Sequence, residues 1–196
     1  MMHTKLCLRL RSVPFLNSEL IVLLNTQKTQ QMANVTLGGN PLHTNGELPT
    51  NGTPATDFSL VNSDLGTTSL DTYKGKKLIL NIFPSIDTGT CATSVREFNK
   101  KASSLDNTTV LCISRDLPFA QKRFCGAEGI ENVVTLSDFR DGEFGKNYGL
   151  ELLDGPLKGL HARSVVVLDE NHQVVYTELV PDIKDEPNYD AALNAL

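Results

Sequence analysis

The feature that most constrains the fold is a buried strand followed at once by a helix and a second buried strand. Residues 77–83 read Lys-Leu-Ile-Leu-Asn-Ile-Phe, a nearly continuous apolar run that ends at Pro84, and such runs are typical of strands covered on both faces. The run Thr109–Ser114 is of the same kind. Between the two runs, apolar residues recur at the spacing of one helix face, at Cys91, Val95, Phe98, Ala102 and Leu105. Strands that alternate with a helix predict an α/β fold.

Further strands are expected on both sides of this unit. A small N-terminal β-hairpin is indicated by Asn34-Val-Thr-Leu-Gly-Gly and Leu42-His-Thr, with turn residues between them. Near the C-terminus, Glu170-Asn-His joins two apolar strands as a second hairpin. The strands expected outside the N-terminal hairpin and the central unit are Asp57–Val61, Val133–Leu136, Ser164–Asp169 and Gln173–Leu179.

Shorter helices complete the predicted order. Asp116 is expected to cap a helix that has Pro118 in its first turn, runs to Cys125 and is stopped by Gly126. Another short helix is expected over residues 141–148. A terminal amphipathic helix is marked by Tyr189, Ala192, Leu193 and Leu196. Together these elements predict a mixed β-sheet flanked by helices.

Residues 1–31 differ in character from the rest of the chain. They carry four basic residues and one acid, so this leader has a charge of +3 and the remainder of the −5 chain has −8. The pattern does not favour a secretory signal, because the apolar run Leu20–Leu24 is short and lies late in the leader. We expect either a disordered leader or an upstream translation start with Met32 as the initiator. One domain is expected over residues 32–196, with a cytoplasmic location.

Composition excludes several classes of function. The acidic pI of about 5.3 disfavours nucleic acid as the main partner, because phosphate contacts need clustered Lys and Arg. No apolar stretch is long enough to span a membrane. The four cysteines are too few for a disulfide-rich secreted scaffold, none forms a CxxC pair, and the histidines show no metal-ligand spacing. The sequence predicts neither a metal nor a cofactor.

Cys91 is the candidate nucleophile, because it opens the helix that follows the first buried strand. A thiol in a first helical turn faces unpaired backbone N–H groups and the positive end of the helix dipole, which stabilise the thiolate. Thr88, three residues earlier, can place its hydroxyl near the sulfur or a bound substrate oxygen. The residues alone also allow Cys91 to be a core residue that begins the apolar stripe.

The sequence around Cys91 and two further segments resemble a known protein family. Pro84-Ser-Ile-Asp-Thr-Gly-Thr-Cys91 matches the P-x-x-x-T-x-x-C signature of peroxiredoxins, and the longer stretch from Asn81 is similar to their thiol peroxidase subfamily, the atypical 2-Cys type. So are Leu111–Gly129, which contains Ser-Arg-Asp-Leu-Pro-Phe-Ala-Gln-Lys-Arg-Phe-Cys-Gly, and Asp154–Arg163. The resemblance runs from about Val35 to the C-terminus and implies a thioredoxin-like fold.

The resemblance also implies roles for four residues. Cys91 would be the peroxidatic cysteine, whose thiolate attacks a peroxide oxygen and becomes a sulfenic acid. Thr88 would hold the thiolate and the peroxide by hydrogen bonds, and Arg163 would stabilise the thiolate and the charge that develops on oxygen. Pro84 would shield the sulfur from water. Without the family, Arg163 is better interpreted as an exposed charge.

The same resemblance makes Cys125 the resolving cysteine. It implies an intramolecular Cys91–Cys125 disulfide, reduced in turn by thioredoxin, with hydrogen peroxide and organic hydroperoxides as substrates and a homodimer as the usual assembly. The two helices are expected to unwind in part, because a disulfide needs Cα atoms within about 7 Å. Cys112 is expected to pack as a core residue, and Cys7 lies in the leader.

Two other functions remain as alternatives. The chain can be a redox sensor that passes its disulfide to a partner and turns over peroxide slowly. It can also be a Cys–His hydrolase that pairs Cys91 with His161.

Overall fold

The computed structural model describes residues 32–196. The predicted leader over residues 1–31, with Cys7 and His3, lies outside the described residues. Within residues 32–196 no helix is long and apolar enough to cross a membrane.

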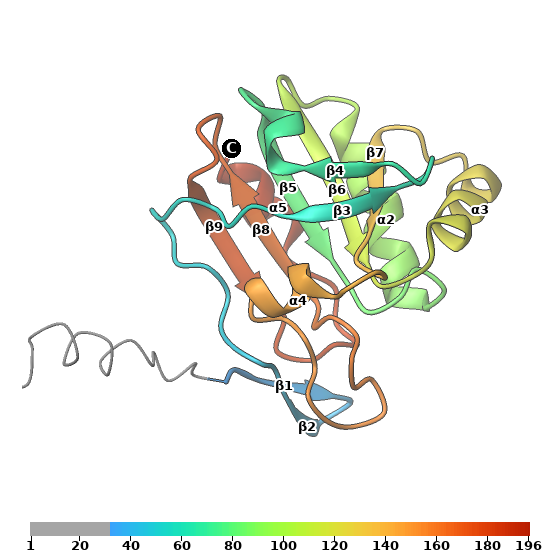
Figure 1. Cartoon of the computed structure of the whole chain (residues 1–196), viewed down its shortest axis with the longest axis vertical. Coiled ribbons are helices and arrows are strands. Elements are labelled where there is room, and N and C mark those ends of the chain that lie inside the picture. The colour runs from blue at the N-terminus through green and yellow to red at the C-terminus, as the bar shows by residue number, and fades with distance from the viewer. Residues whose placement is uncertain (1–31) are drawn as a thin grey trace, which may run out of the picture.

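Seven strands form one mixed sheet in the order β4-β3-β7-β6-β5-β8-β9 (Figure 1). The three central strands β5, β6 and β7 are parallel, and the pairs at both edges are antiparallel. The strands are β3 (Ser59–Asn62), β4 (Thr67–Ser69), β5 (Lys77–Ile82), β6 (Thr108–Ser114), β7 (Val133–Ser137), β8 (Ser164–Leu168) and β9 (Val174–Leu179). The predicted strands and the C-terminal hairpin are therefore confirmed, with ends that shift by one or two residues.

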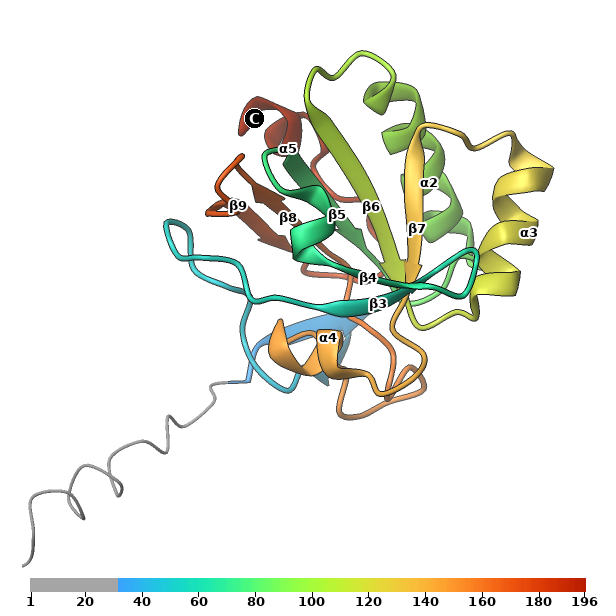
Figure 2. The same cartoon turned by 45° about the horizontal axis from the view of Figure 1, so that its top comes forward.

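Helices cover both faces of this sheet (Figure 2). The central parallel strands are joined by helices, because parallel neighbours need a crossover connection. The helices are η1 (Leu70–Tyr73), α2 (Gly89–Ala102), α3 (Pro118–Glu128), α4 (Glu143–Asn147) and α5 (Tyr189–Asn194).

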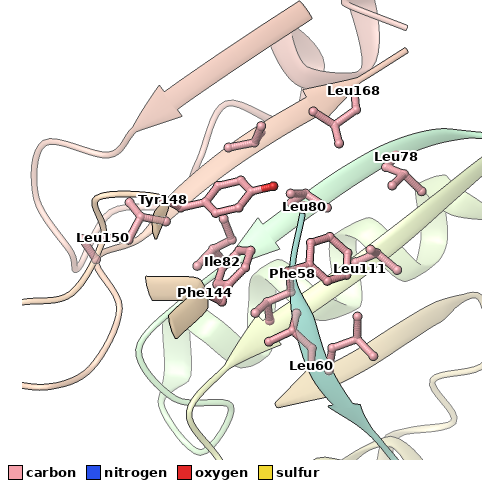
Figure 3. Packing of buried hydrophobic residues seen from close by; sticks show 14 of the residues in the cluster. Phe58, Leu60, Leu78, Leu80, Ile82, Leu111, Phe144, Tyr148, Leu150 and Leu168 are labelled. Carbon is pink, nitrogen blue, oxygen red and sulfur yellow. The ribbon is translucent and has the colours of Figure 1, made fainter. Parts of the chain in front are cut away.

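Two hydrophobic cores lie on opposite faces of the sheet, because successive residues of a strand point to opposite sides. In β5, Leu78, Leu80 and Ile82 enter one core, whereas Ile79 enters the other. The first core, seen in Figure 3, contains Phe58, Leu60, Leu111, Phe144, Tyr148, Leu150 and Leu168 with the three β5 residues. The second core contains Phe83, Cys91, Val95, Phe98, Cys112, Phe124 and Ala192, so α2, α3 and α5 pack on that face.

The N-terminal hairpin is confirmed as a separate two-stranded sheet of β1 (Asn34–Leu37) and β2 (Asn40–His43). The paired residues Val35 and Leu42 are buried in the first core. The hairpin is thereby fixed to the domain by apolar packing.

Asp182 ties the hairpin to the segment after β9. Its carboxylate accepts hydrogen bonds from the Gly38, Lys184 and Gly39 amides and from the Thr36 hydroxyl, at 2.7–3.0 Å. These bonds, that from Gly38 foremost, hold the pKa of Asp182 well below its ordinary value. The hairpin and residues 182–184 therefore form one unit.

The predicted helix forms as α3 with Pro118 in its first turn, as expected, but the predicted cap and the predicted end are wrong. The helix begins at Pro118 after Leu117, whose side chain makes no capping bond, and it runs through Gly126 to Glu128. Gly129, at φ 64°, ends it in the left-handed conformation. Glycine inside a helix costs only about 1 kcal/mol relative to alanine, so the helix continues. Asp116 caps nothing, because its carboxylate binds other donors.

Two further helix ends differ from expectation. Leu105 lies beyond α2, which ends at Ala102, although Leu105 still packs on the second core. Ser103 and Ser104 hydroxyls donate to carbonyls of the last helical turn there and favour its end. The helix expected over residues 141–148 begins only at Glu143, because Gly142 is left-handed at φ 68°.

Candidate active site

The active-site loop, residues 83–88, joins β5 to α2 and delivers Cys91 to the start of that helix. Thr88 is the N-cap residue of α2, and Cys91 is the third residue of its first turn. Cys91 is fully buried, so its sulfur lies away from bulk water in the helical turn whose backbone N–H groups lack intrahelical partners. Such a position stabilises a negative charge.

Thr88 directs its hydroxyl at the sulfur. An N-cap side chain ordinarily accepts from a backbone N–H of the first turn, but Thr88 makes no such bond. Its Oγ1 lies 2.8 Å from Cys91 Sγ and 3.0 Å from the Ser85 carbonyl. Because a hydroxyl carries one proton, it donates to one of these acceptors at a time. The sulfur receives that proton most strongly when it is a thiolate.

Arg163 approaches the sulfur from the other side. It lies just before β8, is only 1% exposed, and its Nη2 donates to Cys91 Sγ at 3.3 Å. Within residues 32–196 it forms no ion pair with a carboxylate. A buried guanidinium is costly without an anionic partner, and the Cys91 sulfur is the group placed to serve as one.

A second guanidinium nitrogen of Arg163 has no partner. Nε donates to the Ile183 carbonyl at 3.0 Å, which fixes the side chain, whereas buried Nη1 has no hydrogen bond within the described part of the chain. Buried donors are almost always paired. An unpaired donor on the guanidinium that contacts the sulfur can donate to a substrate oxygen bound there.

The segment after β9 holds both sides of this arrangement. Ile183 binds Arg163, and the neighbouring Lys184 carbonyl accepts from Thr90 Oγ1 in the first turn of α2 at 3.0 Å. Arg163 and Cys91 are therefore positioned by the same short stretch of chain.

Pro84 is buried in the active-site loop. Its expected role in shielding the sulfur stays a prediction. The structure thus brings Cys91, Thr88 and Arg163 into contact and places Pro84 in the same loop.

Cys125 lies apart from this cluster, on α3, where it packs against the second core. Its thiol is half-buried, and burial raises its pKa above the ordinary value, with a partly opposing hydrogen bond from Thr135. Cys91 and Cys125 are both free thiols in this structure. Around Cys125, residues 126–129 are exposed, whereas Phe124 is buried.

Cys112 is a core residue, as expected. It is fully buried in β6, and burial raises its pKa to about 12. Asn81, its register partner on β5, donates to it at 3.6 Å and to Ser94 Oγ on α2 at 3.3 Å. Ser94 Oγ in turn donates to the Cys91 carbonyl at 2.9 Å. Asn81 on β5 is therefore linked through Ser94 to the first turn of α2. No role is predicted for Asn81 from the sequence. An amide side chain inside an otherwise apolar strand was the feature that could have indicated one.

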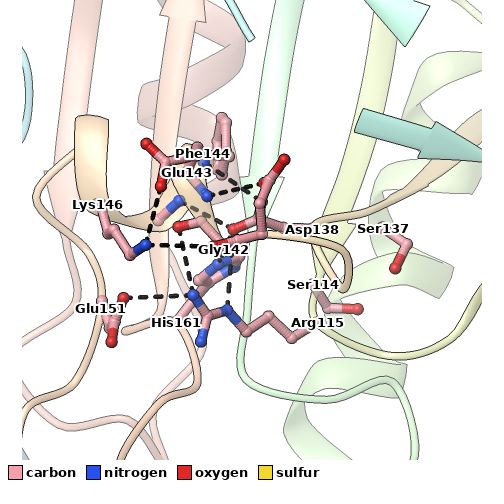
Figure 4. Close-up of polar contacts among 12 residues, drawn as sticks. Ser114, Arg115, Ser137, Asp138, Gly142, Glu143, Phe144, Lys146, Glu151 and His161 are labelled. Carbon is pink, nitrogen blue, oxygen red and sulfur yellow. Dashed lines mark hydrogen bonds and ion pairs between the residues drawn. The ribbon is translucent and has the colours of Figure 1, made fainter. Parts of the chain in front are cut away.

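His161 belongs to a different cluster (Figure 4). Its Nε2 lies 2.9 Å from the fully buried Asp138 side chain, and its ring packs beside Phe144 in the first core. Cys91 packs in the second core, on the other face of the sheet. The structure therefore does not pair His161 with Cys91, and the hydrolase alternative has no geometric support. Within residues 32–196 no group of His, Cys, Asp and Glu side chains is arranged to hold a metal ion.

Known proteins resemble this chain in sequence and in fold. The model of the Redoxin family matches residues 50–193. Proteins named thiol peroxidase are 58% identical in Mycobacterium tuberculosis and 59% identical in Corynebacterium glutamicum, each over 84% of this chain and 99% of the relative. The crystal structure of a peroxiredoxin-like protein from Aquifex aeolicus superposes with a TM-score of 0.78 at 38% identity, covering 84% of this chain and 96% of that one.

Proposed function

Because this chain belongs to the Redoxin family, and within it to the thiol peroxidases, we propose that it reduces hydrogen peroxide and organic hydroperoxides through Cys91 and Cys125. The observation that carries the assignment of the site is the buried Arg163. Its guanidinium lies against Cys91 Sγ, has no carboxylate partner among the described residues, and keeps one nitrogen free. The free donor favours the peroxidase over the alternative of a redox sensor that passes its disulfide to a partner and turns over peroxide slowly.

In the first step, the Cys91 thiolate attacks one oxygen of the peroxide. The S–O bond forms as the O–O bond breaks, the sulfur is oxidised to a sulfenic acid, and the departing oxygen takes a proton and leaves as water or an alcohol. Arg163 Nη1 donates to the peroxide and stabilises the charge that develops on oxygen, which for one such donor lowers the barrier by about 2.7–4 kcal/mol. Thr88 donates to the sulfur or to the peroxide, and Pro84 keeps water away.

In the second step, the Cys125 thiolate attacks the sulfenic sulfur. A disulfide forms, and the hydroxyl group leaves as water after it gains a proton. The raised pKa of Cys125 keeps it protonated in the closed structure. Unwinding of the exposed residues 126–129 brings Cys125 into water, where the thiolate forms more readily, and lets it reach Cys91.

Thioredoxin then reduces the disulfide by thiol–disulfide exchange and restores both thiols. A thioredoxin-dependent cycle fits a cytoplasmic enzyme, and we propose that location and a homodimeric assembly. The proposed domain is residues 32–196.

The test measures peroxide consumption with a complete thioredoxin system. We expect Cys91→Ser to abolish turnover. Cys125→Ser should complete one oxidation of Cys91 and then stop, because no disulfide forms for thioredoxin to reduce. Cys112→Ser is the matched control, since that thiol is buried and protonated, and its turnover should equal that of the wild type. Full turnover by Cys91→Ser would refute the assignment.

Intact mass gives an independent check. Wild-type protein treated with one equivalent of peroxide should lose the mass of two hydrogens, and Cys125→Ser should instead gain one oxygen. A gain of oxygen by the wild type with no loss of hydrogen would contradict the disulfide step.

A further inference from the structure

The carboxylate of Asp116, which does not cap α3, is directed at the active-site loop. Ser85 Oγ donates to its Oδ1 at 2.7 Å, and the Ile86 amide donates to its Oδ2 at 2.7 Å. Ser114 Oγ, at the end of β6, donates to the same Oδ2 at 2.7 Å. Hydrogen bonds to an ionised acceptor are about twice as strong as neutral ones. Asp116 therefore holds two consecutive residues of the loop against the end of the central strand.

The carboxylate is itself held from behind. Gln121 is fully buried on α3, and its Nε2 donates both to Ser114 Oγ and to the Leu136 carbonyl of β7, each at 3.0 Å. Ser114 thus receives a hydrogen bond from α3 while it donates to Asp116. The acceptor that faces the loop is fixed to two neighbouring elements of the fold.

The charge of Asp116 cannot serve the thiolate directly. Among residues 32–196 it makes no ion pair, so neutral donors alone surround it. A negative charge does not stabilise a sulfur that must itself become negative. Its contribution to the reaction is therefore one of geometry.

The loop that Asp116 holds contains the acceptor that competes for the Thr88 proton. The Ser85 carbonyl accepts from Thr88 Oγ1 at 3.0 Å and from the Thr88 amide at 3.2 Å. The same hydroxyl lies 2.8 Å from Cys91 Sγ. A shift of Ser85 therefore moves Thr88 relative to the sulfur.

We propose that Asp116 is a positioning residue for peroxide reduction. Its carboxylate holds Ser85 and Ile86 so that the Thr88 hydroxyl faces Cys91 Sγ at hydrogen-bond distance. Asp116 touches no reacting atom itself. This inference rests on the proposed function of Cys91.

The experiment compares two reactions of the same sulfur, in a Cys125→Ser background that isolates the first step. The rate constant with hydrogen peroxide depends on the placement of Thr88, whereas alkylation of Cys91 by iodoacetamide depends only on the thiolate. We expect Asp116→Ala to slow the peroxide reaction by about 10- to 100-fold, because a misplacement of about 1 Å costs that much. Alkylation should fall by a clearly smaller factor, because it depends on the thiolate but needs no hydroxyl aligned with a peroxide.

Asp116→Asn retains one oxygen acceptor and should fall between wild type and Asp116→Ala. Ser85→Ala removes only the loop's donor and should also slow the peroxide reaction selectively, which keeps the test decisive if Asp116→Ala does not fold. The matched control is Asp64→Ala, which removes an exposed carboxylate whose partner is Lys122 on α3, at 3.2 Å, and should leave both rates unchanged.

Equal losses in the peroxide and alkylation rates would show a general structural defect and overturn the inference, as would an unchanged peroxide rate in folded Asp116→Ala. The wild type is measured first. If it consumes no peroxide, the proposed function falls and this inference with it, whereas normal wild-type turnover with unaffected variants overturns this inference alone.

Discussion

Replacing Thr88 by valine removes one hydroxyl group from the Cys91 sulfur and leaves the shape of the side chain unchanged. Thr88 is exposed, and the Ser85 carbonyl keeps the hydrogen bond from the Thr88 amide, so no buried group loses its last partner. We therefore expect the unfolding free energy to stay close to that of the wild type. The change isolates the 2.8 Å contact between Thr88 Oγ1 and Cys91 Sγ.

The expected loss of rate follows from the charge on the sulfur. A hydrogen bond to a charged group contributes about 1.5–3 kcal/mol. Since about 1.36 kcal/mol corresponds to a tenfold change in rate, Thr88→Val should slow the oxidation of Cys91 by about 10- to 150-fold. The effect belongs to the first step, because Thr88 has no contact with Cys125.

The assay is a single-turnover reaction of reduced protein in the Cys125→Ser background. The chain contains no tryptophan, so the reaction is quenched at intervals and the oxidised fraction is read by intact mass. Thr88→Ser keeps the hydroxyl and should recover most of the rate. The matched control is Thr108→Val, whose hydroxyl donates to the Asp106 carbonyl and has no contact with the active-site residues. A loss in Thr108→Val as large as in Thr88→Val, or a wild-type rate in Thr88→Val, would refute the reasoning.

Three other substitutions test separate parts of the structure. Arg163→Met should slow peroxide reduction by about 10²- to 10³-fold. It should also slow alkylation of Cys91 at neutral pH, because the thiolate loses the cation that stabilises it. An alkylation rate equal to that of the wild type would contradict this. The pKa of Asp182 is lowered in the fold, so its carboxylate contributes stability above its ordinary pKa of 3.8, and this contribution is lost as the pH falls further. Asp182→Asn should therefore lower the melting temperature at pH 7 and weaken the dependence of the melting temperature on pH below pH 4. The same dependence on pH in the variant and the wild type would contradict this. Gly149→Ala should lower the free energy of unfolding by about 1–3 kcal/mol, because φ is 71° at this position and a Cβ would meet the Glu47 backbone. An unchanged midpoint of urea unfolding would contradict this.

The sequence predicts the fold well where one local signal agrees with burial. The run over residues 77–83 and the stripe from Cys91 have the periods of a covered strand and an amphipathic helix, and both elements form. The errors lie at helix ends, where distant partners decide. Asp116 has the chemistry of an N-cap, but donors from the loop after β5 occupy its carboxylate, and nothing near it in the chain indicates that contact.

For the candidate site, too, contacts between residues close in sequence could be predicted, whereas contacts between distant residues could not. The spacing of Thr88 and Cys91 is local, so a helix start is enough to predict that the hydroxyl and the sulfur are neighbours. Arg163 lies 72 residues from Cys91 and is buried, against the ordinary behaviour of arginine; only the resemblance to a family indicated it. The hydrogen bond from Arg163 to the Ile183 carbonyl could not be predicted either. It depends on where the segment after β9 lies in the fold, and the periodicity of apolar residues does not indicate that.

The continuous link from the N-terminal hairpin to the sulfur bears on how the protein is handled in the laboratory. The hairpin binds Asp182, the adjacent Ile183 carbonyl holds Arg163, and Arg163 contacts Cys91. At the opposite end of the chain, the Leu196 carbonyl accepts from Lys77 Nζ at the start of β5. An affinity tag is therefore better joined ahead of residue 32 than after Leu196. Trimming into Asn34–His43 to obtain a smaller crystallisable fragment should cost catalytic competence and also uncover the part of the first core that Val35 and Leu42 fill.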